Sequence, residues 1–108
     1  MANFLFLYTG GNNGMNATPE EQKAIIQAWT DWYTGMGAAV VDPGNPFLPV
    51  AKSISSDGKV SDKPVGTPAS GYTIITADSL DAATAMAKGC PHLKAGGQVS
   101  VYETINVM

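Results

Sequence analysis

The order of the elements that the sequence predicts is strand, helix, strand, hairpin, strand, helix, strand, and it predicts an α+β fold. Three observations carry this prediction. A short apolar run of strand length opens the chain, two stretches combine helix-capping residues with apolar residues at helical spacing, and later runs are rich in β-branched residues. Two helix crossovers joined by antiparallel elements indicate a ferredoxin-like sandwich, with two helices on one face of an antiparallel sheet. The length of 108 residues predicts a single domain, residues 1–108.

The first half of the chain is expected to hold a strand, a long helix and a short strand. Phe4–Tyr8 is a continuous apolar run ending at a glycine-rich stretch, residues 10–14, which lacks the Lys-Ser/Thr pair of a phosphate-binding loop. Thr18 can cap a helix whose first turn contains Glu21, which completes a capping box, and the helical spacing then continues for about 17 residues. Ala38–Val41 has the composition of a short strand, and the prolines that follow exclude a helix.

The second half is expected to hold a hairpin, a loop, a strand, a helix and a final strand, over residues 52–60, 62–70, 71–77, 80–88 and 99–103. Asp57-Gly58 is a typical hairpin turn. Asp78 is expected to cap the second helix, whose alanines indicate close packing against a sheet. Gly89 is expected to end that helix, before a turn that contains the only cysteine and the only histidine.

Both faces of the predicted sheet are apolar. Helices on one face would leave the other to water, where antiparallel strands normally show polar residues. Here the first strand points apolar side chains to both sides, as does the strand with two adjacent isoleucines: Phe4, Phe6 and Tyr8 oppose Leu5 and Leu7, and Ile74 opposes Ile75. We therefore expect a homodimer in which the two sheets pack face to face and bury about 1,500 Å² or more in total.

The charge balance excludes several classes of partner. Six Lys and Arg residues are scattered along the chain against nine Asp and Glu, for a formal net charge of −3. Binding to nucleic acid or to a membrane surface needs clustered cations, so neither partner is expected. The N-terminal residues have neither the basic segment nor the apolar length of a signal or a membrane span. The single cysteine suits a reducing compartment, and we expect a cytoplasmic protein.

The only cysteine and the only histidine lie two residues apart, at Cys90 and His92. Imidazole is the side chain that ordinarily exchanges a proton near neutral pH, so His92 is the candidate catalytic acid or base. The alternative is a structural role, in which it bonds the carbonyls at the end of the second helix or bonds across the turn. Cys90 is a candidate ligand-binding residue, with the alternative of a small packed apolar side chain. Two such residues are too few for a metal site, and neither a metal nor a cofactor is expected.

Four further residues are candidates for a site around the histidine. Asp62 lies in a loop that could fold over a cleft and take part in catalysis, or it could form an Asx turn. Tyr8 and Trp29 could wall an aromatic pocket, although tryptophans at helical spacing are more often part of a core. Tyr72 lies on a predicted strand and could line the same cavity or pack within the core.

Several segments resemble a known family of small proteins. They are Thr18-Pro19-Glu20-Glu21 before a tryptophan-bearing helix, Asp62-Lys63-Pro64-Val65, the strand Gly71–Ala77, Ala77-Asp78-Ser79-Leu80-Asp81, and Gly89-Cys90-Pro91-His92-Leu93. Together they are similar to the YCII-related family, in the branch named for an Asp-Gly-Pro-Phe motif. The resemblance implies a dimeric α/β barrel with a cleft near the dimer interface.

The chain departs from that family at its proposed reactive residues. Activity in the family is inferred from a histidine–aspartate pair, and here Trp29 and Cys90 stand at approximately those two positions. Lys63 and Val65 replace the glycine and the phenylalanine of the branch motif. The resemblance therefore carries over the cleft but not the pair. Relatives in this branch are similar to proteins found beside or fused to sigma-factor-like regulators, which implies a protein partner.

Two functions are expected from these observations. The first is binding of a small aromatic or cyclic organic molecule in a cleft between sheet and helix, with isomerase- or lyase-type proton transfer at His92 and Asp62. The second is a non-catalytic sensor or protein-interaction module linked to transcription regulation. A cofactor-independent oxygenase would rest on analogy with the barrel fold alone. The residues by themselves do not decide whether the protein is an enzyme.

Overall fold

A computed structural model describes residues 1–11 and 17–106 of the chain. Its elements are β1 (Ala2–Gly10), α1 (Pro19–Met36), the 3-10 turn η1 (Gly37–Ala39), β2 (Val40–Asp42), β3 (Ser53–Ile54), β4 (Val60–Ser61), β5 (Ala69–Ala77), α2 (Leu80–Ala87), α3 (Pro91–Lys94) and β6 (Gly97–Glu103). The expected α+β class is thereby confirmed. Part of the glycine-rich stretch discussed above, residues 12–14, lies outside the described residues.

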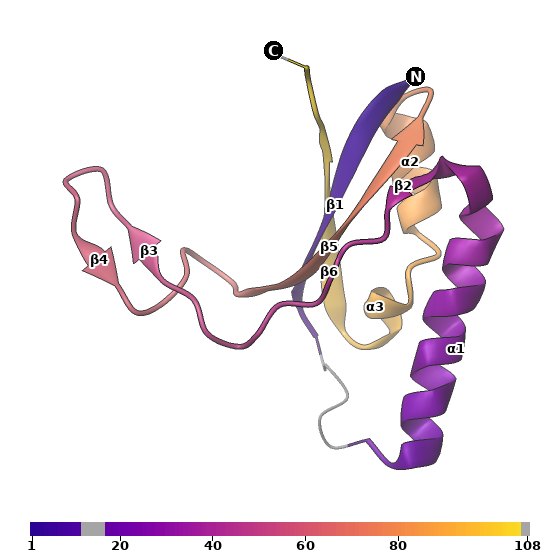
Figure 1. Cartoon of the computed structure of the whole chain (residues 1–108), viewed down its shortest axis with the longest axis horizontal. Helices are drawn as coiled ribbons and strands as arrows, with labels where there is room; N and C mark the ends of the chain where they lie inside the picture. Colours follow the sequence, from indigo (N-terminus) through magenta and orange to yellow (C-terminus); the bar gives the residue numbers. More distant parts are fainter. Residues whose placement is uncertain (12–16, 107–108) are drawn as a thin grey trace.

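The main sheet is antiparallel and has four strands in the order β2-β5-β1-β6, which confirms the expected antiparallel sheet. The first strand of the chain is therefore central, and it pairs with β5 (Ala2 opposite Ala77) and with β6 (Phe4 opposite Glu103). Figure 1 shows α1 and α2 on the same side of this sheet, while the hairpin of β3 and β4 extends away on the other side. In the described part of the chain, no helix is both long and apolar enough to cross a membrane.

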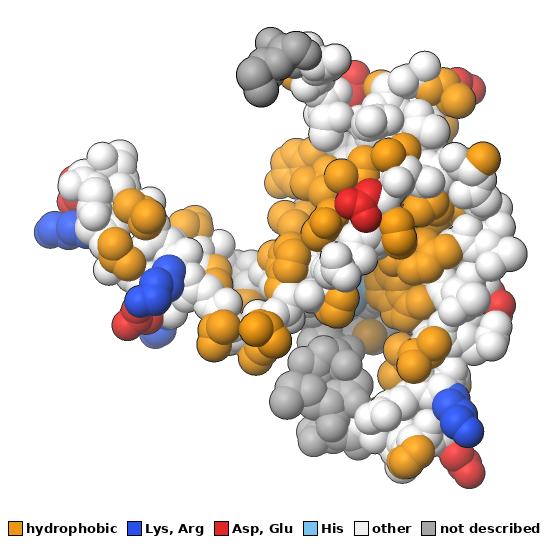
Figure 2. Space-filling model, in the orientation of Figure 1, with side chains coloured by type: hydrophobic (Ala, Val, Ile, Leu, Met, Phe, Trp, Pro, Cys, Tyr) orange, Lys and Arg blue, Asp and Glu red, His pale blue; other side chains and the backbone are white. Residues whose placement is uncertain are grey.

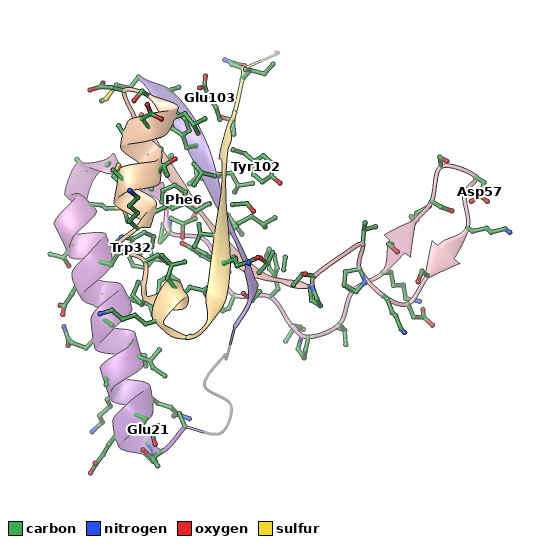
Figure 3. All side chains as sticks on the ribbon, turned by 180° about the vertical axis from the view of Figure 1, so that it is seen from behind. Phe6, Glu21, Trp32, Asp57, Tyr102 and Glu103 are labelled. Atoms are coloured by element: carbon green, nitrogen blue, oxygen red, sulfur yellow. The ribbon has the colours of Figure 1, made fainter. Side chains whose placement is uncertain are left out.

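The core lies between the sheet and the helices. Alternation along β1 turns Phe4, Phe6 and Tyr8 toward the helices, and all three are buried. The ring of Trp32 on α1 stacks on that of Phe6, with centroids 6.0 Å apart, and Figure 3 shows the two side chains meeting between helix and sheet. The small side chains of α2, with Ala83 fully buried, let that helix approach the sheet closely, as its composition predicted.

Both long helices begin with side-chain caps. The predicted capping box of α1 is confirmed, because the Glu21 N–H donates to Thr18 Oγ1 (3.1 Å) and the Thr18 N–H donates to Glu21 Oε1 (3.4 Å). The cap of α2 is Ser79 and not Asp78. Ser79 has the extended backbone of an N-cap, and its Oγ accepts the N–H of Ala82 at 3.0 Å.

Several bounds differ from the sequence prediction: β1, β5 and β6 are longer than the expected residues 4–8, 71–77 and 99–103, and α2 ends one residue earlier, at Ala87. The strand expected at residues 38–41 begins only at Val40, because Gly37, with φ of 55°, ends α1 and a 3-10 turn follows it. The segment expected as a turn around His92 contains the short helix α3. Pro91 takes its first position, where the missing N–H of proline has no intrahelical partner to lose.

The predicted hairpin is confirmed, with Asp57 and Gly58 at its turn. The Lys59 N–H donates to Asp57 Oδ1 at 3.0 Å, and Gly58 has a positive φ of 87°. Figure 3 places Asp57 at the outer tip, far from the helices. We call residues 47–68, which comprise this hairpin and its two flanking segments, the arm.

Truncation of Phe6 to alanine tests the core. Its side chain is fully buried and stacked on Trp32, so Phe6→Ala should lower the free energy of unfolding by about 3–5 kcal/mol, measured by chemical denaturation. The control is Ile26→Ala on α1, where the side chain is 65% exposed and the change should stay within about 0.5 kcal/mol. Equal losses in the two variants would contradict this placement of the core.

Candidate functional site

A cavity of about 930 Å³ lies between α1, the adjoining ends of β1 and β5, α3 and the loop after β2. Figure 2 shows hydrophobic side chains gathered in the hollow between α1 and the sheet. The aromatic residues Tyr8, Trp29 and Tyr33 form much of its wall, and Tyr72 and His92 also line it. A largely apolar concave site with a few polar groups is the usual form of a small-molecule pocket.

Tyr8 is the aromatic residue at the floor of the cavity. It projects from β1 toward the helices, and its ring lies edge-on to Trp29 at 5.2 Å and tilted against His92 at 5.5 Å between centroids. Its hydroxyl donates to Thr73 Oγ1 at 2.6 Å. Burial raises the pKa of Tyr8 far above its usual range, because the phenolate would be poorly solvated, and the Thr73 bond only partly offsets this. Tyr8 is therefore a neutral wall and hydrogen-bond donor.

Thr73 on β5 joins the polar groups beneath this wall. Its hydroxyl donates to the Pro43 carbonyl at 3.0 Å and accepts from Tyr8. The Tyr33 hydroxyl, from α1, lies 3.2 Å from Thr73 Oγ1 and 3.3 Å from the same carbonyl. Because each hydroxyl has one hydrogen, Tyr33 can donate either to the Pro43 carbonyl or to the second lone pair of Thr73 Oγ1, while Thr73 keeps its bonds to Tyr8 and Pro43. The network links α1, β1, β5 and the loop after β2.

His92 reaches the cavity from α3 and is 8% exposed. Its Nε2 lies 3.0 Å from the Thr9 carbonyl, and since a carbonyl only accepts, Nε2 carries the hydrogen. The ring edge lies against Gly11 and Gly97, where a Cβ atom at Gly97 would stand 2.0 Å from Nε2. The neutral ring then has its lone pair on Nδ1, which can accept a hydrogen bond or a proton. The His92 ring therefore bonds a carbonyl of β1, and not the carbonyls at the end of α2 that the structural alternative named.

Cys90 is buried behind the site and does not line the cavity. It stands at the N-cap position of α3, between the end of α2 and Pro91. Burial raises the pKa of its thiol to about 11, and the hydrogen bond from the His92 backbone N–H offsets only part of that rise. A thiol held in this state at neutral pH is a packed apolar group and a poor nucleophile.

Asp62 is separate from the other candidates. It lies on the arm with its side chain 88% exposed, and its carboxylate pairs with Lys52 Nζ at 3.1 Å. The chain therefore brings Tyr8, Trp29, Tyr72 and His92 to one cavity, but it does not bring Asp62 there. Two charged side chains do line the cavity, Glu21 at the start of α1 and Lys94 at the end of α3.

Tyr72 borders the cavity where β5 meets the loop after β2. Alternation along β5 turns it to the opposite side of the sheet from Thr73. Its ring tilts against Phe47 at 6.0 Å, and its hydroxyl donates a long hydrogen bond (3.4 Å) to Asp42. The loop after β2 passes close to the backbone of β5 at Gly44, where a Cβ atom would fall 1.8 Å from the Tyr72 carbonyl oxygen.

Sequence reasoning missed three parts of the site: Tyr33, Thr73 and the loop Pro43–Pro46. A signal for Tyr33 was present, because it follows Trp29 by four residues and so lies on the same helix face. No local signal marked the other two parts. Pairing of residues about 30 positions apart brings them together, including the bridge between Pro46 and Gly71.

Among residues 1–11 and 17–106, no group of three or more His, Cys, Asp or Glu side chains is placed to hold a metal ion. No protein-family model and no curated protein matches the sequence. The resemblance to the YCII-related family accordingly stays a prediction, and the function is argued from the site itself.

Substitution of Gly97 tests the position of the imidazole. In Gly97→Ala the new methyl group would overlap His92, so the Thr9 hydrogen bond should be lost and the free energy of unfolding should fall by about 1–3 kcal/mol. NMR of the single imidazole reports its displacement directly. The control is Gly35→Ala, where nothing lies within 4 Å and the helix should gain about 0.5–1 kcal/mol. Unchanged imidazole signals in Gly97→Ala would refute this packing.

The raised pKa of Cys90 predicts a pH dependence of both reactivity and stability. At pH 8, alkylation should be about 100-fold slower in the folded than in the unfolded chain, because the pKa is about 11 against an ordinary 9.0. The folded state keeps its proton while the unfolded state loses it, so stability should fall as the pH rises from 9.0 toward 11. Cys90→Ala should reduce that slope in pH-dependent denaturation. An equal slope in both proteins would rule this out.

Proposed function

We propose that the protein binds a small aromatic or cyclic organic molecule in the cavity between α1 and the sheet. The observation that carries the proposal is a space of about 930 Å³ with Tyr8, Trp29 and Tyr33 in its wall. This volume lies within the range typical of small-molecule sites. Aromatic rings offer broad flat contacts and pair favourably with a flat ligand.

Of the two charged side chains at the cavity, Glu21 bonds the Thr18 N–H in the capping box of α1, and Lys94 favours a ligand with an acidic group. Lys94 lines the cavity from α3, and among the described residues the lysine that forms an ion pair is Lys52 on the arm and not Lys94. A carboxylate or phenolate would accept hydrogen bonds from the Lys94 ammonium group, and a ligand hydroxyl could donate to Nδ1 of His92, while the aromatic walls hold the ring. Aromatic acids and phenols are therefore the first ligand classes to examine.

The same arrangement also supports a catalytic version of the proposal, in which His92 transfers a proton. With Nε2 bonded to Thr9, Nδ1 of His92 could remove a proton from a ligand carbon and return it to another position, which is the chemistry of an isomerase. In an elimination the C–H electron pair would instead form a double bond and expel a leaving group from the neighbouring carbon, and that group would take the proton back from His92. Tyr8 and Cys90 stay protonated and do not compete as bases. Asp62 of the same chain is not placed to assist.

The second candidate, a non-catalytic sensor or interaction module, is favoured by one observation. The hydrogen bond of the His92 ring goes to a backbone carbonyl, and none of the described acidic side chains bonds to the ring to orient it as a base. Ligand occupancy could then serve as a signal to a protein partner, with no chemical step.

The proposal includes the finer fold and the assembly expected from the sequence. The strand order β2-β5-β1-β6, with both crossover helices on one face, supports a ferredoxin-like arrangement and with it the likeness to the YCII-related family. Half-buried Leu5 and Ile74 and the 55% exposed Tyr102 lie side by side on the sheet face away from the helices. A homodimer with these faces together would cover them.

A thermal-shift screen with aromatic acids, phenols, quinones and lactones tests the binding proposal. A ligand at 100 times its dissociation constant should stabilise the protein by about 2.7 kcal/mol. Ala24→Phe should abolish the shift, because this exposed residue lines the cavity and a larger side chain would fill it. The matched control is Ala85→Phe, exposed on α2 and away from the cavity, where the shift should persist.

The outcomes separate the candidate functions. A shift lost in Ala24→Phe and kept in Ala85→Phe supports the site, and turnover of that compound by wild-type protein but not by His92→Gln would add the catalytic step. A ligand whose shift survives Ala24→Phe binds elsewhere and contradicts the site. The lack of any saturable ligand across the panel would favour the interaction module.

A further inference from the structure

The arm carries hydrophobic side chains that its own chain leaves in solvent. All six of its large hydrophobic residues are exposed, by 45% to 86%: Phe47, Leu48, Val50, Ile54, Val60 and Val65. The hairpin pairs just two residues of β3 with two of β4, and local hydrogen bonds around its turn, such as Ser55 N–H to the Lys59 carbonyl, and the exposed Lys52–Asp62 ion pair add to this short ladder. An isolated two-stranded hairpin is at best marginally stable in water. The arm thus has the composition of an interface element.

The chain exposes more surface than a folded monomer of its mass. Its accessible area is 7668 Å², whereas a compact monomer of 11.2 kDa exposes about 5,700 Å². The radius of gyration is 15.3 Å, against about 13 Å for a compact chain of this length. The excess of roughly 2,000 Å² per chain is what each subunit of an obligate dimer contributes to its interface.

The uncovered side of the sheet is a surface that such an arm would fit. Figure 1 shows the arm leaving the sheet on the side opposite to the helices, so that arm and sheet form the two limbs of an L. The molecule is only 19 Å thick along its shortest axis, against 44 and 41 Å along the others. Figure 3 shows Tyr102 on the limb formed by the sheet, facing away from α1. Two such shapes related by a twofold axis can interlock, each arm on the other's sheet.

Charge favours the same pairing. The arm holds three of the six basic residues and two of the nine acidic residues, so it has a formal charge of +1. The rest of the chain then has a formal charge of −4. The arm and the body of another copy therefore have opposite formal net charges, which favours their association at long range.

We propose that residues 47–68 form a dimerisation arm whose apolar side, with Ile54 and Val60, packs on the open sheet face of a second copy of this chain. This inference rests on the homodimer of the proposed function and adds the element that holds it together. The exchange is reciprocal, because a twofold interface uses the same two surfaces of both copies. In this dimer the open sheet face of each copy is covered by the sheet of the other copy and by its arm.

The register of the hairpin provides a matched pair of variants. Ile54 lies opposite Val60, and the next pair, Ser53 opposite Ser61, points to the other side of the hairpin. Ile54→Lys with Val60→Glu replaces the apolar side by charges and keeps a favourable cross-strand pair. Ser53→Lys with Ser61→Glu places the same two charges on the opposite side. Tyr102→Lys changes the sheet face alone.

Sedimentation of the full-length protein over a concentration range of about 1,000-fold gives the dimer dissociation constant of each variant. Wild type should form a dimer of twice 11.2 kDa, the Ile54/Val60 variant should bind at least about 100-fold more weakly, and the Ser53/Ser61 control should stay within about threefold. Circular dichroism should show all variants folded, because the changed arm residues lie outside the core.

Different experimental results would overturn different parts of this proposal. Wild type that remains monomeric at every concentration would overturn both the homodimer and the arm. Loss of the dimer in Tyr102→Lys with no effect of the Ile54/Val60 change would overturn the arm alone and keep face-to-face sheets. A dimer equally weakened by the Ser53/Ser61 control would overturn the assignment of the apolar side.

Discussion

The core and the cavity both depend on the burial of Tyr8. Its ring lies under α1, against Trp29 and His92, and its hydroxyl would be costly to bury without a partner. Thr73 supplies that partner and passes the connection to the carbonyl of Pro43. One buried hydroxyl group therefore links the central strand, its neighbour and the loop at the cavity edge. The shape of the cavity is in this way a property of the core and not of a separate set of loops.

A second constraint is the number of layers that a chain of this size can build. Two crossover helices cover one side of four strands, and no described segment of the same chain covers the other. The side chains of Leu5 and Leu7 on that side are only half-buried, although the strand is central. The open sheet face and the arm both expose apolar side chains to water, and association of two copies would cover both surfaces.

Local patterns predicted most of the fold. Alternation in β1 and the capping box of α1 are short-range features, and the structure contains both. The cap of α2 was assigned one residue early, because Asp78 and Ser79 are both good caps and only the backbone decides between them. The site was less predictable. Thr73 joins it through distant pairing, and the composition around Asp62 does not reveal that its loop extends away from the cavity.

The position of β1 in the sheet has a consequence for synthesis on the ribosome. Of the four strands in the sheet, β1 is synthesised first, and both of its neighbours, β5 and β6, come much later in the sequence. Ala2 pairs with Ala77, and Phe4 pairs with Glu103. Its aromatic side chains therefore have no sheet to join until β5 and β6 have emerged. Non-local pairing of this kind slows folding and lengthens the time during which apolar segments are exposed. During that interval the nascent chain exposes the apolar residues of β1, which makes it vulnerable to aggregation.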